Sequence, residues 1–123
     1  MIEIRISIET AVILLKERID SEFDKRIRNG EIAKGLTLNN LSYKHLLNII
    51  ETSTFDLVCL LPAELLTDQT NLTEIITKTI RSLADVYNKD EFAIYSKRKA
   101  ESLINPIIHL LRRSQKSKDF LNN

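Results

Sequence analysis

The hydrophobic pattern at the start of the chain changes its period near residue 8. In residues 2–8 every second position is isoleucine, which is the alternation of a short β-strand. From there the apolar positions recur at steps of three and four, as on one face of an amphipathic helix; they are Val12, Leu15, Ile19, Phe23 and Ile27. The pattern predicts an N-terminal strand and then a helix that ends near Asn29 and Gly30. The alternative is that residues 2–8 are the first turns of that helix.

The opposite side of this helix carries charged residues of opposite sign at a spacing of four. Glu22 precedes Arg26, and Asp24 precedes Arg28. Side chains at this spacing are neighbours on a helix, and such pairs stabilise it modestly. We therefore expect this side of the helix to face solvent.

Two helix starts follow in the middle of the chain. Ser42 can cap a helix through residues 43–51, and Ser53, with Asp56 three residues on, is a second start. Pro62 either opens a new turn or kinks the second segment. The first of these helices has on its apolar side Tyr43, Leu46, Leu47 and Ile50.

The next apolar stripe indicates a strong helix. Asn71 with Glu74 has the spacing of a capping box at the start of that helix. The stripe recurs at helical spacing and consists of Leu72, Ile76, Ile80, Leu83 and Tyr87. Asp90 then marks the start of the last helix.

Pro106 lies within the last helical pattern. When residues 92–116 are placed on a helix at about 100° per residue, the apolar positions before and after the proline fall on one arc. These positions are Phe92, Ala100, Leu103, Ile107, Leu110 and Leu111. We expect the proline to kink one helix, and the alternative is a separate helix with Asn105 as its N-cap. In either case the apolar arc is expected to face the core.

The opposite arc of the last helix is basic. This basic stripe, with Tyr95 nearby, consists of Arg98, Asn105, His109, Arg112, Arg113 and Lys116. Its spacing suits a helix that follows phosphate groups or an acidic partner. Two ordinary explanations stay open. Cations are favoured near a helix C-terminus, and the acidic middle of the chain can neutralise the stripe within the fold.

Charge is divided unevenly along the chain, although the net charge is only +1. Residues 51–91 hold three basic and eight acidic side chains, whereas residues 92–123 hold seven basic and two acidic ones. This asymmetry is typical of an interaction surface, and equally of two segments of one fold that attract each other.

Length and composition favour a mainly α fold. A chain of 123 residues is expected to form one domain over residues 1–123, and only two glycines and two prolines leave few places for the turns of an all-β fold. The expected fold is a four- to five-helix bundle with a short N-terminal β-strand. No stretch reaches the roughly 18 to 20 apolar residues of a membrane span. The lone Cys59 lies in an apolar run, so we expect a buried thiol in a cytoplasmic, reducing environment.

The sequence contains no arrangement of residues that is typical of catalysis. His45 and His109 do not have the spacing that places two ligands on one helical face. With Gly30 and Gly35 as the only glycines, no glycine-rich phosphate loop can form. We therefore expect no enzymatic activity, no cofactor and no metal site.

The expected function is that of a non-enzymatic helical interaction module, such as a small subunit, adaptor or regulator in a larger assembly. A strand from Ile2 to Ile8 leaves backbone groups unpaired, so it is the expected pairing edge for a homo-oligomer or a protein partner. The alternative is a protein that binds nucleic acid through the basic stripe without sequence specificity. No membrane partner is expected.

Overall fold

Helices make up all the regular structure in the part of the chain that the computed structural model describes, residues 7–60 and 69–121. The four α-helices in these ranges are α1 (Ile8–Arg28), α2 (Tyr43–Cys59), α3 (Gln69–Val86) and α4 (Lys97–Leu121). Two short 3-10 helices lie in the connections, η1 (Leu38–Asn40) and η3 (Asp90–Ile94). The prediction of a mainly α fold is confirmed.

The start of α1 bears on the predicted N-terminal strand. Ser7 is the N-cap of this helix, and its hydroxyl accepts a hydrogen bond of 3.1 Å from the Thr10 N–H. The strand prediction is therefore wrong at its last position, because Ile8 is the first residue of α1. The rest of the predicted strand, residues 2–6, lies outside the described residues.

The end of α1 confirms the predicted helix boundary. Asn29 is the C-cap, and its N–H donates to the Lys25 carbonyl over 3.0 Å. Gly30 follows with φ +78°, a conformation that glycine adopts at little cost.

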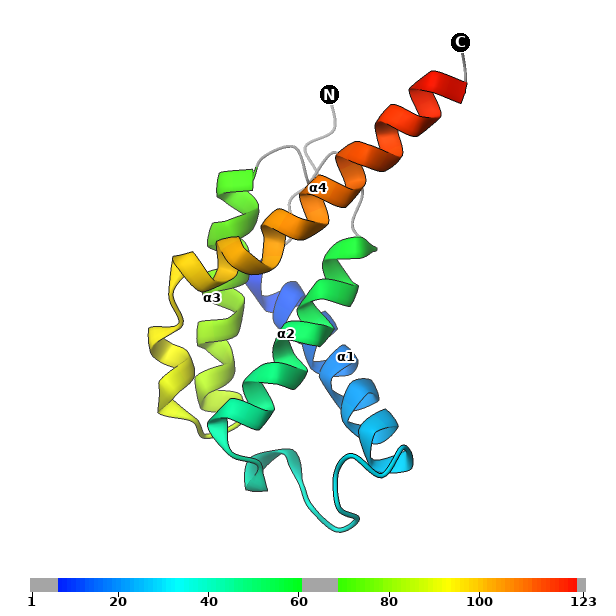
Figure 1. Cartoon of the computed structure of the whole chain (residues 1–123). Coiled ribbons are helices and arrows are strands. Elements are labelled where there is room, and N and C mark those ends of the chain that lie inside the picture. The colour runs from blue at the N-terminus through cyan, green and yellow to red at the C-terminus, as the bar shows by residue number, and fades with distance from the viewer. Residues whose placement is uncertain (1–6, 61–68, 122–123) are drawn as a thin grey trace.

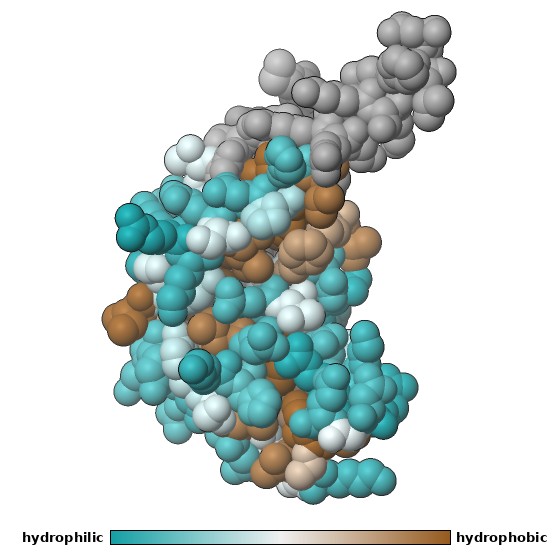
Figure 2. Space-filling model, viewed as in Figure 1, coloured by the Kyte–Doolittle hydropathy of each residue, from teal (hydrophilic) through white to brown (hydrophobic). Residues whose placement is uncertain are grey.

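The four helices are arranged so that α2 and α3 are each packed from two sides. α1 contacts both of them, and α4 contacts the same two helices (Figure 1). The predicted apolar faces of α1 and α3 point into the core between them, with Leu15 and Ile19 from α1 and Ile80 and Leu83 from α3 fully buried. Figure 2 shows mainly hydrophilic residues on the drawn face of the body, with hydrophobic ones in small groups.

The predicted break at Ser53 is wrong, because α2 runs without interruption from its Ser42 cap to Cys59. The buried hydroxyls of Ser53 and Thr54 donate to the carbonyls of Ile49 and Ile50, each over 2.7 Å. A hydroxyl that bonds back to the preceding turn is satisfied inside a helix, so it no longer marks a helix start.

Arg26 joins α1 to α2. Its guanidinium pairs with Glu22 over 3.0 Å, as the spacing predicted, but it also donates to Asn48 (2.8 Å) and Thr52 (3.3 Å) of α2. The Arg26 and Glu22 side chains are each only 15% exposed, so the expectation of a solvated face is wrong here. The position of α2 causes this burial. The second expected pair, Asp24 with Arg28, does not form an ion pair in the described structure.

The boundaries of α3 and α4 also differ from prediction. The described part of α3 begins at Gln69, so Asn71 lies within the helix and is not its N-cap. The apolar stripe that the sequence predicts for α3 is nevertheless buried. Asp90 begins η3, and α4 begins only at Lys97, where the Ser96 hydroxyl accepts a hydrogen bond of 3.2 Å from the Lys99 N–H.

The hydroxyls of Tyr87 and Tyr95 are buried and have no hydrogen-bond partner within the described structure. Burial, with a smaller effect of the Asp20 charge, raises the pKa of Tyr87 to about 12. Burial, and to a smaller extent the charges of Glu51 and of ionised Tyr43, also raise the pKa of Tyr95. The neutral phenols thus favour the folded state below the unfolded pKa of about 10, and this contribution is lost as the pH rises through the folded value.

We predict that these two phenols ionise only when the chain unfolds. In a Tyr43→Phe background, which leaves Tyr87 and Tyr95 as the only tyrosines, phenolate absorbance at 295 nm and loss of helical circular dichroism should rise together above pH 10. Phenolate absorbance that appears while the helical signal is intact would contradict this burial. Tyr95→Phe should leave stability unchanged or increase it, because the removed hydroxyl has no partner.

Candidate interaction surface

α4 carries all six residues of the basic stripe, and the described side chains among them are exposed. Arg98, Asn105 and His109 are exposed, and at about 100° per residue they lie along one side of the helix. Arg112, Arg113 and Lys116 belong to the same helix, but their side chains lie outside the described residues. We call the side defined by Arg98, Asn105 and His109 the outer face of α4.

Pro106 does not divide the helix. α4 is continuous from Lys97 to Leu121, so the expectation of one helix is confirmed and the alternative with Asn105 as an N-cap is wrong. The proline is exposed. Water can therefore satisfy the Ser102 carbonyl, which loses its helical hydrogen bond because proline has no N–H.

The inner face of α4 holds the helix against α2 and α3. Ala100, Ile104, Ile107 and Ile108 are buried, the first three of them almost completely. The predicted arc was therefore rotated from the true one: Leu103 is only partly buried, and Leu110 is 54% exposed. Phe92 is fully buried but belongs to η3, and the Leu111 side chain lies outside the described residues.

Burial of these residues decides which side of α4 faces outward. A fully buried isoleucine side chain contributes about 1.5 to 3 kcal/mol, whereas an exposed ion pair contributes about 1 kcal/mol at most. We call the contact of these buried residues with α2 and α3 the apolar seat of α4, or its seat. The apolar seat therefore dominates over the ionic contacts at the edges of the helix. The outer face lies on the opposite side from this seat.

The acidic middle of the chain reaches the edges of α4. On α3, the hydrogen bond from Lys78 (3.1 Å) and then the charges of Lys78 and Lys97 lower the pKa of Glu74. On α2, burial raises the pKa of Glu51, and the charge of Lys99 opposes that shift. Lys97 and Lys99 thus interact with carboxylates of their own chain, on either side of the outer face.

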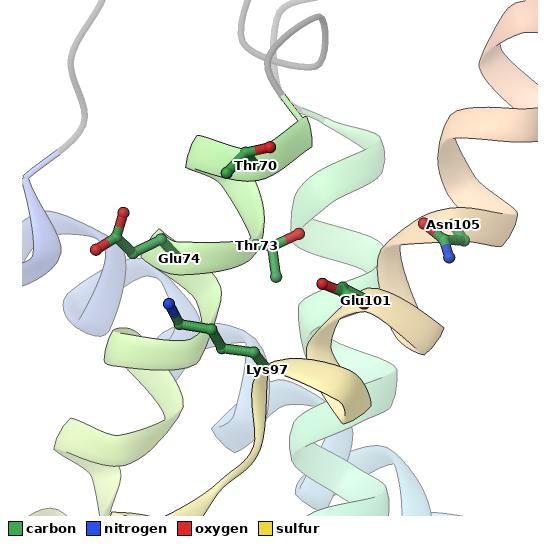
Figure 3. A pocket seen from close by; sticks show the side chains of 6 residues that line it. All are labelled: Thr70, Thr73, Glu74, Lys97, Glu101 and Asn105. Atoms are coloured by element: carbon green, nitrogen blue, oxygen red, sulfur yellow. The ribbon is translucent and has the colours of Figure 1, made fainter.

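A polar depression lies between α3 and α4 beside the outer face. Its volume is about 220 Å³, and it is lined by Thr70, Thr73, Glu74, Lys97, Glu101 and Asn105. In Figure 3 the Lys97 side chain extends toward Glu74, and Glu101 points toward Thr73. Sequence reasoning placed only Asn105 among candidate site residues, because the depression exists only once α3 and α4 are packed together.

Two residues near this surface differ from expectation. Tyr95, expected beside the basic stripe, is only 1% exposed, so its ring is not available at the surface. Cys59, expected to be buried, is exposed at the end of α2. Partial burial and the nearby Asp56 raise the pKa of the Cys59 thiol, which keeps it protonated and weakly nucleophilic.

In residues 7–60 and 69–121, no group of three or more His, Cys, Asp or Glu side chains is arranged to hold a metal ion. No helix in the same ranges is both long enough and apolar enough to cross a membrane.

Comparison with known proteins gives no match: no family model fits the chain, and neither a curated protein nor a solved structure is significantly similar to it. Function is therefore inferred from the geometry and charge of α4.

We predict that Glu51→Gln stabilises the protein at pH 7. Because burial raises the pKa of Glu51, the folded state disfavours its charged form; its contribution to stability is present below the unfolded pKa and is lost as the pH rises through the folded one. Urea unfolding should show a gain for the variant at pH 7 that disappears at pH 4, with the exposed Glu101→Gln as the matched control. A loss of stability at pH 7 would mean that attraction to Lys99 outweighs burial.

Proposed function

We propose that this chain is a non-enzymatic helical interaction module, a small subunit, adaptor or regulator, that docks through the outer face of α4 onto an acidic surface of a protein partner. The observation that carries the proposal is the division of charge around α4. Lys97 and Lys99 interact with Glu74 and Glu51 of the same chain, whereas Arg98, Asn105 and His109 remain exposed between them.

The course of α4 supports the same proposal. Figure 1 shows its C-terminal half continuing beyond the ends of α2 and α3. The sequence of that half is strongly basic, with Arg112, Arg113, Lys116 and Lys118 against a single acidic residue, Asp119. A polar helix gains little stability without tertiary packing, so an acidic surface laid against it would stabilise it.

Nucleic acid is the second candidate partner. A helix of 25 residues is about 38 Å long and could follow several phosphates of a polynucleotide. Binding to single strands usually adds stacking of bases on aromatic rings, and the one aromatic residue expected near the stripe, Tyr95, is buried. This burial favours a protein partner over a nucleic acid.

The test compares two polyanions that stand for the two partner classes. Immobilised poly-glutamate represents an acidic protein surface, and a short RNA or DNA represents nucleic acid. We predict salt-sensitive binding to poly-glutamate that weakens roughly 10-fold or more in the Arg112→Glu/Arg113→Glu variant, because two attractive charges become repulsive. The measurement is a binding isotherm at several salt concentrations.

The matched control reverses two exposed basic residues away from α4. Lys16→Glu/Arg18→Glu on α1 changes the net charge by the same amount and should retain most of the binding. Tighter binding to nucleic acid than to poly-glutamate would establish the second candidate. No binding to either polyanion at low salt, or equal losses in both variants, would overturn the docking role of α4.

A further inference from the structure

We propose that the acidic surface that α4 meets belongs to a second copy of this chain, placed so that the two α4 helices run antiparallel. This inference rests on the docking role proposed above. It adds the identity of the partner and the symmetry of the contact.

The chain has an exposed acidic group beside the start of α4. Asp85 lies in the last turn of α3, and Asp90 and Glu91 lie in η3, which directly precedes α4. All three are exposed, and none forms an ion pair with a described side chain. We call these three residues the acidic end of the molecule.

We call Arg112, Arg113, Lys116 and Lys118 the basic end of α4. One chain cannot neutralise its acidic end with its own basic end. Because α4 is one continuous helix, residues 112–118 lie about 22 to 32 Å along its axis from Lys97. Figure 1 accordingly shows the C-terminal end of α4 and the segment of η3 at opposite ends of the molecule. Charges this far apart are screened at physiological ionic strength, where the Debye length is about 8 Å.

Two copies can satisfy both ends at once. With antiparallel α4 helices, the basic end of each copy lies beside the acidic end of the other. The two contacts are equivalent by a two-fold axis, so the pair closes and does not grow into a filament. The opposite charges of residues 51–91 and residues 92–123 in the sequence are complementary in this arrangement.

The experiment measures the mass of the full chain alone, without nucleic acid, by sedimentation velocity. We predict a dimer at about 50 mM salt that dissociates at about 500 mM salt, where the Debye length falls to about 4 Å. Arg112→Glu/Arg113→Glu and Asp90→Lys/Glu91→Lys should each weaken the dimer at least ~10-fold at low salt. Lys16→Glu/Arg18→Glu should dimerise like the natural chain, and circular dichroism checks that every variant folds.

Mixing gives the decisive arm. Each reversed variant repels itself, but in an equimolar mixture both contacts are again between opposite charges, so a mixed dimer should form. A chain that stays monomeric at low salt, a dimer that neither reversal weakens, or reversed variants that do not recombine would each overturn the proposal. If the chain is monomeric but its binding to poly-glutamate depends on Arg112 and Arg113, the docking role of α4 stands and only the second copy is excluded.

Discussion

The apolar seat of α4 on α2 and α3 is the contact that determines which residues of this helix face outward. Ala100, Ile104 and Ile107 are almost completely buried there, and their burial outweighs the ion pairs available to the surrounding lysines. The seat fixes the rotation of α4 about its axis. That rotation places Lys97 toward α3, Lys99 toward α2, and Arg98 toward solvent.

The same rotation explains how the charge asymmetry of the sequence is used. In the sequence, attraction within the fold and attraction to a partner are alternatives. In the structure, attraction within the fold involves Lys97 and Lys99, and the proposed attraction to a partner uses other residues of α4. Glu74 and Glu51 act on Lys97 and Lys99 at the edges of α4, whereas the residues of its outer face are exposed. The continuity of α4 through Pro106 then separates its basic end from the acidic end by most of the length of the helix.

Features set by local spacing could be predicted from the sequence. The span of α1, its end at Asn29 and the buried stripe of α3 all follow from helical periodicity and turn chemistry. Ser53 shows the limit of this reasoning, because a serine hydroxyl can cap a helix or bond back within one, and sequence does not distinguish the two. The burial of Arg26 could not be predicted either, since it depends on where α2 packs.

Prediction of the candidate site was limited for the same reason. Arg98, Asn105 and His109 were placed on an exposed side correctly, because three positions along one helix share a face whatever the neighbours are. The exposure of Leu110 and the burial of Tyr95 differ from the sequence prediction, because both depend on how α4 and η3 meet the other helices. The depression beside Asn105 has no sequence signature, since it combines residues of two helices.

Amide hydrogen exchange of Ile104 and Ile107 in the dilute, monomeric chain tests the seat of α4 most directly. If the seat holds as described, these amides exchange only through global unfolding, and the free energy from their exchange rates equals that from urea unfolding. Exchange with a much smaller free energy, while amides in the core of α1 and α3 keep the global value, would show that α4 detaches on its own. The rotation of α4 would then not be fixed, and the outer face defined here would not be presented to a partner.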